Sequence, residues 1–376
     1  MEQFFLLSGT SFIITFFVFT IFIKVFIKRN FLDTPGGRKI HTVETPSMGG
    51  LPIFIGFVIS VLIWSPLESL VDIKFVLSAL GIMFIIGFRD DLINLRAFQK
   101  LLGQLAAALI IVAICDIRFQ SLYGLFGIYE VSDYLSYPIS VFTIIVITNA
   151  FNLIDGIDGL AGSVGLVSSI FFGVWFYLAG MESYSFICFA LLGAILAFLQ
   201  FNWAPSKVFM GDTGSLLIGF FLSIITIRFI SGNYLADEGA TYKFSAFIAP
   251  AVAVLIVPLY DTLRVFIKRI LRGKSPMHPD KTHLHHILLR LGCNHSQATS
   301  ILATVNIIFV LLALVLKDFS DSIVLPALLI TALALGTIAE LIFKSMIEKR
   351  KEELKERNRM QREDAKVVPI SKSTGS

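Results

Sequence analysis

The chain has 376 residues, of which 56% are hydrophobic and only 15% are charged, and its mean hydropathy is +0.81. A soluble domain usually carries about a quarter charged residues, so this composition excludes an ordinary soluble globular protein. The formal charge of +4 is small, and we expect no nucleic-acid partner. The three cysteines are too few and too scattered for a disulfide framework or a zinc knuckle.

Apolar segments long enough to cross a bilayer recur along most of the chain. A helical span needs about 20 predominantly apolar residues, and shorter spans are tolerated where neighbouring helices bury their ends. The sequence therefore predicts an all-α, polytopic membrane helix bundle of about 11 transmembrane helices. The expected spans cover 4–27, 51–66, 75–88, 101–117, 135–152, 163–180, 185–201, 215–230, 244–263, 298–316 and 322–343.

The positions of the basic residues predict the orientation of this bundle. Alternate loops, together with the segment after residue 343, hold 26 of the 31 Lys and Arg residues. By the positive-inside rule those segments are cytoplasmic, which puts the N-terminus outside and the C-terminus inside. Residues 1–343 then form the membrane domain. Residues 344–376 form a cytoplasmic tail of mixed basic and acidic residues, expected as a solvated helix or a disordered stub.

Two adjacent carboxylates, Asp90 and Asp91, lie where an apolar span meets the predicted cytoplasmic face. Neighbouring carboxylates repel each other, so at a membrane boundary they favour a bound cation or a shared proton. The alternative is that they only end the helix in water. In the preceding cytoplasmic loop, Lys39 and Arg38 are either part of a phosphate clamp or ordinary residues of a positive-inside loop.

Four polar residues end the fifth span at three-residue spacing: Asn149, Asn152, Asp155 and Asp158. On a helix this spacing forms one slowly drifting polar stripe. Close helix packing explains the glycines between them, but it does not explain two carboxylates and two amides on one face. Oxygen ligands of this kind suit a hard cation such as magnesium, so the pattern predicts an ion or phosphate site.

Two further cytoplasmic segments carry chemistry. Asp212 lies in Gly-Asp-Thr-Gly-Ser before the span from 215, where backbone N–H groups can turn toward an anion, although helix capping is an alternative. His283, His285 and His286 do not share one helix face, so we expect an irregular loop. A cationic or hydrogen-bonding clamp for phosphate suits them better than a zinc site, because no cysteine accompanies them.

Together these segments resemble the polyprenyl-phosphate N-acetylhexosamine-1-phosphate transferase superfamily, glycosyltransferase family 4. The resemblance spans most of residues 30–297 and rests on five motifs in the family's order: Pro-x-Met-Gly-Gly, Asp-Asp, Asn-x-x-Asn-x-x-Asp-Gly-x-Asp-Gly, Gly-Asp-x-Gly-Ser and the histidine loop. The His-Leu-His-His sequence and the Leu-Leu-Arg-Leu-Gly after it look like the bacterial branch that uses UDP-GlcNAc and undecaprenyl phosphate. The branch that makes the first peptidoglycan lipid intermediate has a different histidine loop.

The resemblance implies a role for each matched residue. It makes residues 1–343 the catalytic domain and assigns the metal site, for Mg²⁺ with Mn²⁺ as a substitute, to Asp212 and Asn152. The implied catalytic residues are Asp90, Asp91, Lys39, His283, His285 and His286, and the implied substrate-binding residues are Asn149, Asp155, Asp158, Asn202 and Phe209.

The implied reaction transfers GlcNAc-1-phosphate from UDP-GlcNAc to undecaprenyl phosphate, releases UMP and initiates a cell-envelope polysaccharide such as O-antigen, common antigen or a teichoic acid linkage. The resemblance also implies the bacterial cytoplasmic (inner) membrane, an active site on its cytoplasmic face and a homodimer. Direct attack and a covalent aspartyl intermediate both stay open. The alternatives are another UDP-N-acetylhexosamine or UDP-MurNAc-pentapeptide as donor, a lipid or ion transporter, and a silent assembly scaffold. Carboxylates at span ends favour catalysis over a transporter with midplane sites.

Overall fold

The computed structural model describes residues 2–28, 46–275 and 282–367, and within them nearly all regular structure is helical. The only extended pairing in these residues is a single parallel bridge between Ser47 and Phe209. The predicted all-α fold is therefore confirmed. The helices are α1 Glu2–Lys28, α2 Gly50–Trp64, α3 Leu67–Ile93, α4 Ala97–Leu109 with a π-helical turn Ile110–Ile114, α5 Asp133–Ile154, α6 Leu160–Leu178, α7 Glu182–Asn202, α8 Gly211–Leu235, α9 Ala249–Val254, α10 Ile256–Leu271, α11 Leu284–Arg290, α12 His295–Val315 and α13 Asp321–Val367, with a 3₁₀ turn at Leu125–Gly127.

Ten of the eleven expected spans correspond to single helices, α1 to α8, α12 and α13. Among the described residues, nine helices are long and apolar enough to cross a membrane, and α2, with 15 residues, is a shorter apolar helix. These helices make the protein an integral membrane protein, as the composition predicted.

The eleventh expected span, 244–263, is wrong as a single helix. The chain forms the short helix α9, breaks at Leu255 and continues as α10. Pro258 has no N–H to donate to the carbonyl of Val254, four residues earlier, so the helix loses a bond at this point. Asn306 on α12 donates its side-chain N–H to that carbonyl at 3.2 Å, which stabilises the break inside the bundle.

Helix α8 forms the centre of the bundle. It is apolar around its whole circumference, and 94% of the residues in its apolar window are buried. A helix of this kind is stable only when neighbours cover every side. Here the neighbours are α2, α3, α5 and α6. The first turn of α8, which carries the Gly-Asp-Thr-Gly-Ser motif, is therefore enclosed by the ends of other helices.

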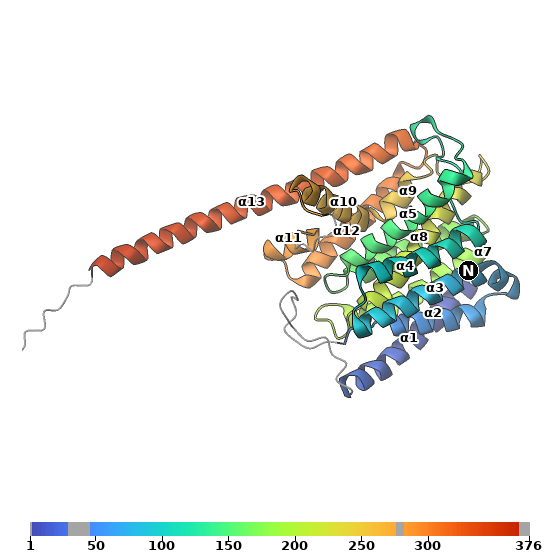
Figure 1. Cartoon of the computed structure of the whole chain (residues 1–376), viewed down its shortest axis with the longest axis horizontal. Coiled ribbons are helices and arrows are strands. Elements are labelled where there is room, and N and C mark those ends of the chain that lie inside the picture. The colour runs from blue at the N-terminus through green and yellow to red at the C-terminus, as the bar shows by residue number, and fades with distance from the viewer. Residues whose placement is uncertain (1, 29–45, 276–281, 368–376) are drawn as a thin grey trace, which may run out of the picture.

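The two ends of the described chain lie at opposite ends of the bundle. Figure 1 shows the N-terminus beside α7 at one end and the C-terminal half of α13 projecting past α11 beyond the other. This arrangement agrees with the odd number of spans that the sequence predicts. Helix α13 continues without a break through residue 344, so the start of the predicted tail is a direct extension of the last membrane helix.

Candidate active site

Asp91, near the end of α3, caps the N-terminus of α8. Its carboxylate accepts hydrogen bonds from the backbone N–H of Asp212 at 2.8 Å and of Thr213 at 2.9 Å, and from the Thr213 hydroxyl. The first N–H groups of a helix have no partner within the helix, and the helix dipole favours a negative charge there. The Asp-Asp pair and the Gly-Asp-Thr-Gly-Ser motif therefore form one structural unit.

The first motif, Pro-x-Met-Gly-Gly, lies against the same turn of α8. The Phe209 N–H donates to the Pro46 carbonyl at 2.9 Å, and the Gly49 N–H donates to the Phe209 carbonyl at 2.9 Å. A side chain at Gly50 would overlap the backbone of Gly214 in α8. The second glycine of the motif is thus required by close approach of two backbones.

Lys100, in the first turn of α4, joins carboxylates from two other helices. Its ammonium group pairs with Asp90 on α3 and lies 3.3 Å from Oδ1 of Asp212 on α8. Asp90 is buried and also accepts from the Leu95 N–H at 2.5 Å, which fixes the loop between α3 and α4. The side chains of Lys100 and Asp212 keep 27% and 30% of their surface exposed, so an anionic ligand can reach this pair.

The two asparagines of α5 have different surroundings. Asn152 donates its side-chain N–H groups to Oδ1 of Asp212 at 2.8 Å and to the Ser215 hydroxyl at 2.7 Å. Asn149 pairs with Gln104 of α4, donating to its carbonyl oxygen at 2.8 Å. Asn152 therefore lies at the carboxylate cluster, whereas Asn149 ties α5 to the helix that carries Lys100.

The polar stripe expected on one helix is wrong beyond Asn152. Helix α5 ends at Ile154, and Asp155 and Asp158 lie in the turn that follows. Gly159 closes this turn with φ of +80°, a conformation that favours glycine. The two carboxylates are held by a loop, and they reach the cluster from a different direction than a continuous helix would give.

Asn202, at the end of α7, holds this turn in place. Its Oδ1 accepts from the Gly159 N–H at 2.8 Å, and its Nδ2 donates to the Val208 carbonyl at 2.8 Å. Asp158 accepts from the Ser206 N–H at 3.3 Å. Both side chains are buried, so in this structure Asn202 and Asp158 join two loops beside the cluster.

Asp155 is surrounded by negative charge. Burial, and then the carboxylates of Asp212, Asp91 and Asp158, raise the pKa of Asp155 well above its usual value. Burial and these neighbouring carboxylates both penalise the ionised form of Asp155. A cation at this position would relieve that penalty.

A magnesium ion fits these residues. Asp212 offers carboxylate oxygen, and the side-chain N–H groups of Asn152 are used on Asp212 and Ser215, which leaves its carbonyl oxygen as a ligand atom. The described residues contain no group of three or more His, Cys, Asp or Glu arranged to hold a metal. Mg²⁺ needs no such cage, since one or two carboxylates hold it and waters or phosphates complete its shell.

The histidines lie on a short helix and its cap, so the expected irregular loop is wrong. His283 precedes α11, and His285 and His286 lie in its first turn. The rings of His283 and His285 stack, with centroids 5.7 Å apart and planes at 6°. A side chain at Gly156 would come within 2.6 Å of Nε2 of His285, so α11 packs against the turn that contains Asp155. His283 faces the Asp261 carboxylate at 2.9 Å.

Three predicted residues remain to be placed: His285, Phe209 and Lys39. Burial and the neighbouring His286 lower the pKa of His285 to about 3, so His285 is neutral and offers hydrogen bonds rather than charge. Phe209 is half-buried in the segment before α8. Lys39 lies outside the described residues.

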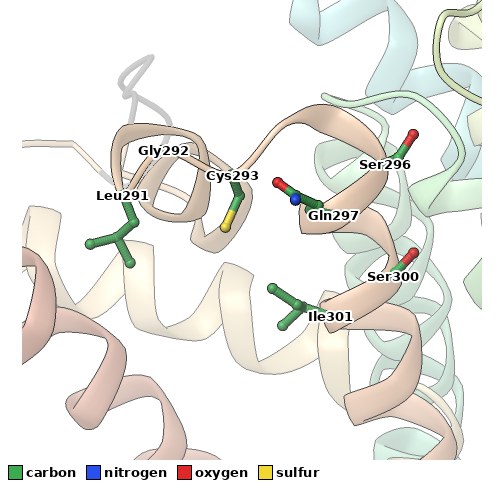
Figure 2. A pocket seen from close by; sticks show the side chains of 7 residues that line it. All are labelled: Leu291, Gly292, Cys293, Ser296, Gln297, Ser300 and Ile301. Carbon is green, nitrogen blue, oxygen red and sulfur yellow. The ribbon is translucent and has the colours of Figure 1, made fainter.

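An open hollow lies between α11 and the start of α12, and its lining includes none of the carboxylates of the cluster (Figure 2). None of its lining residues is charged. It therefore contributes no acid, base or carboxylate ligand to the site. Its lining consists of Leu291, Gly292, Cys293, Ser296, Gln297, Ser300 and Ile301.

Sequence reasoning missed Lys100, Gln104 and Asp261. In the sequence, Lys100 is one of three basic residues of a predicted cytoplasmic loop. A signal was present, because Lys100 and Gln104 are four residues apart in an otherwise largely apolar helix and therefore share a face. Asp261 stands alone in an apolar stretch, and intramembrane or boundary carboxylates are functional candidates by default.

Comparison with known proteins identifies relatives over most of the chain. A sequence profile of the family described as Glycosyl transferase family 4 matches residues 73–230. The chain is 32% identical over 320 residues to a probable undecaprenyl-phosphate N-acetylglucosaminyl 1-phosphate transferase of Bacillus subtilis, covering 84% of this chain and 86% of that protein. It is 33% identical to a decaprenyl-phosphate N-acetylglucosaminephosphotransferase of Mycolicibacterium smegmatis, with 78% and 77% covered. It is 29% identical to an undecaprenyl-phosphate alpha-N-acetylglucosaminyl 1-phosphate transferase of Salmonella typhi, with 78% and 80% covered.

Proposed function

The chain belongs to glycosyl transferase family 4, and from that premise we propose that it transfers GlcNAc-1-phosphate from UDP-GlcNAc to undecaprenyl phosphate and releases UMP. The observation that carries the proposal is the junction of Asp90, Lys100 and Asp212 at the meeting point of three helix ends. The names of the relatives support the sugar phosphate and the polyprenyl phosphate acceptor.

The junction suits the chemistry because both substrates are anions. An oxygen of the lipid phosphate attacks the β-phosphorus of the UDP-sugar, and the bond from that phosphorus to the bridging oxygen breaks as UMP leaves. The ammonium group of Lys100 lies where it can donate to a phosphate oxygen as negative charge develops. Mg²⁺ held by Asp212 and Asn152 would neutralise diphosphate oxygens, and Mn²⁺ would substitute for it.

The carboxylate contacts favour direct attack over an aspartyl intermediate. Asp90 is paired with Lys100, and Asp91 accepts three hydrogen bonds from the first turn of α8. A carboxylate that is committed to such contacts is a poor nucleophile until they break. The lipid phosphate is already largely ionised at neutral pH, so the reaction does not require a strong general base. Asp91 then acts by holding α8 in place.

We infer that the site lies on the cytoplasmic face of the bacterial cytoplasmic membrane. The projecting half of α13 marks the same end of the bundle as α11 (Figure 1), and the basic residues concentrate in the segments of that end. UDP-sugars would reach the exposed edge of Lys100 and Asp212 from water, and the prenyl chain would stay in the bilayer. Homodimerisation and the identity of the downstream polymer stay predictions.

A doubly labelled donor tests the proposed function. Purified protein in nanodiscs is given undecaprenyl phosphate, Mg²⁺ and UDP-GlcNAc that carries ³H in the sugar and ³²P at the β-phosphorus. We expect both labels in the lipid phase in equal amounts, matched by UMP, and neither label after EDTA treatment or without lipid. Transfer of ³H alone, with UDP as the product, would show sugar transfer instead. No lipid labelling with UDP-GlcNAc, another UDP-N-acetylhexosamine or UDP-MurNAc-pentapeptide would favour a transporter.

A further inference from the structure

Gln104 of α4 and Asn149 of α5 form an amide pair within two of the apolar spans. The Asn149 side-chain N–H donates to the Gln104 carbonyl oxygen at 2.8 Å, and the Gln104 N–H donates to the Asn149 carbonyl oxygen at 3.4 Å. Gln104 is only 2% exposed. The hydrocarbon of a bilayer offers no water that could replace such a contact, so the two amides depend on each other and on the backbone.

The pair lies one helical turn away from two groups of the Asp212 junction. Lys100 precedes Gln104 by four residues on α4, and the two therefore share a helix face. Asn152 follows Asn149 by three residues on α5 and shares its face in the same way. Lys100 and Asn152 approach one atom, Oδ1 of Asp212, at 3.3 Å and 2.8 Å. A slide of α4 along α5 by one residue, about 1.5 Å, would therefore move the ammonium group away from that carboxylate.

We propose that Gln104 and Asn149 are positioning residues, which set the offset of α4 along α5 and thereby hold the Lys100 ammonium group where the phosphate reacts. The inference rests on the proposed function, because the phosphate is its substrate group. It gives Asn149 a different role from the substrate binding that the family resemblance implies. The Asn149 side-chain nitrogen is used on Gln104 and on the Ile145 carbonyl at 2.8 Å, and the pair acts through Lys100 without touching the substrate.

A directional contact specifies an offset that apolar packing alone does not. A hydrogen bond weakens steeply as its atoms move out of line, whereas two leucines pack almost equally well at neighbouring offsets. A single buried asparagine fixes the register of a coiled coil in this way, at a cost in stability. Helix α4 has particular need of such a contact, because Phe98, Leu101 and Leu102 on its outer side are exposed, and fluid lipid does not resist sliding.

Leucine substitutions separate positioning from simple stabilisation. Gln104→Leu and Asn149→Leu each leave a buried amide without its partner and should lower Tm, whereas the double variant removes both polar groups and should have a higher Tm than either single variant. We expect kcat for lipid labelling to fall about 10- to 10²-fold in all three variants. The KM for UDP-GlcNAc should change less than about threefold. Recovery of kcat together with Tm in the double variant, or a large rise in KM confined to Asn149→Leu, would overturn the inference.

A double-mutant cycle tests the route through Lys100. In a chain that already carries Lys100→Met, Gln104→Leu should lower kcat by less than about twofold further, because the group that the pair positions is gone. Losses that multiply would show that the pair does not act through Lys100. The control is Ser183→Ala, since Ser183 of α7 donates to Asp72 at 3.0 Å near the opposite end of α3. This variant should stay within about twofold of the wild-type kcat, and a loss as large as in Gln104→Leu would overturn the positioning role.

The offset of the two helices can also be measured without turnover. Spin labels are attached through Phe98→Cys on α4 and Phe142→Cys on α5, both at positions that are 68% exposed, in full-length protein whose three native cysteines are replaced by alanine. Electron–electron distance measurements in nanodiscs should give one narrow distribution for this parent and a shifted or broader one when both amides are leucine. The same distribution in both proteins would overturn the inference. A parent that shows this difference but labels no lipid would instead overturn the proposed function.

Discussion

Lys100 illustrates how a single residue acquires its role from the fold. In the sequence it is one basic residue of a cytoplasmic loop, and only its four-residue spacing from Gln104 distinguishes it from Arg89 and Arg96. In the structure it is the cation between Asp90 and Asp212, which lie far apart in the chain. The acidic partners could be predicted because two carboxylates at a membrane boundary are unusual. Their counter-charge is harder to predict, because basic residues are ordinary in such loops and the spacing from Gln104 indicates only a shared helix face.

Replacing Lys100 by methionine should lower turnover by about 10²- to 10³-fold, the range for losing one group that stabilises developing charge. The methionine keeps the apolar length of the side chain and removes only the ammonium group. The measurement is the initial rate of lipid labelling at saturating substrates. Arg89→Gln, at an exposed position of α3, is the control and should stay within about twofold of wild type. If both variants and the wild type label lipid at equal rates, Lys100 takes no part in the reaction.

The raised pKa of Asp155 predicts how magnesium affinity depends on pH. A proton and a cation compete for the same cluster of carboxylates, so lowering the pH favours the protonated form and weakens metal binding. The Mg²⁺ concentration that gives half-maximal activity should therefore rise as the pH falls from 8 to 6. In Asp155→Asn the dependence should be flatter, measured by magnesium titration at each pH. A half-maximal concentration that is the same at both pH values in the wild type would contradict this reading.

At the scale of elements, the site consists of helix ends that support one another. The end of α3 caps α8 through Asp91, and Asp261 of α10 accepts from the first N–H of α11. The sequence predicts most of the helices because long apolar runs are unambiguous. It does not predict the break at Leu255, because the residues before and after this position are equally apolar. Pro258 is the one sequence feature that indicates a break. The histidine segment is helical because Asp261, distant in sequence, caps it.

The packing of α3 on α8 predicts different effects for two glycines on one helix. A side chain at Gly87 would lie 2.6 Å from the Asp212 carbonyl oxygen and 2.6 Å from the Thr213 Cα, so backbone atoms would have to move. Gly87→Ala should therefore destabilise the protein by about 1–3 kcal/mol. At Gly81 no atom lies within 4 Å of the added carbon. Gly81→Ala should be neutral or stabilising by up to about 1 kcal/mol.

Thermal unfolding of both variants in the same detergent checks this difference. A lower Tm for Gly87→Ala with an unchanged or higher Tm for Gly81→Ala is expected. If the Tm of both variants changes by the same amount, the close contact between α3 and α8 is not the reason that Gly87 is required.

For the whole molecule, the sequence predicts the class, the membrane location and ten of the eleven spans, because the bilayer restricts spanning segments to apolar helices. It does not predict which helix is central. Helix α8 is buried on all sides, whereas α1 is equally apolar and has only 28% of its window buried. Hydropathy measures preference for an apolar environment, and lipid and protein interior satisfy it equally.

The length of α13 predicts that its last part is dispensable for catalysis. The described side chains from Arg350 onward are exposed, and Glu340, which anchors Arg264, lies earlier in the helix. A chain that ends after Lys349 should label lipid within about twofold of the full-length rate, because exposed residues contribute little to packing. The comparison is made at equal amounts of folded protein. Loss of activity in the shortened chain would show that the extension takes part in the reaction.

We propose that the junction around Asp212 performs magnesium-dependent phosphoryl transfer, and Asp212→Asn removes the carboxylate at its centre. Asparagine keeps the size of the side chain and removes its charge. The measurement is the rate of ³²P transfer from β-labelled UDP-GlcNAc to undecaprenyl phosphate, for wild type and variant of equal Tm. We predict a rate lower by at least about 10²-fold that added Mg²⁺ does not restore. A variant that retains the wild-type rate would contradict this mechanism, because the reaction would then occur without the Asp212 carboxylate.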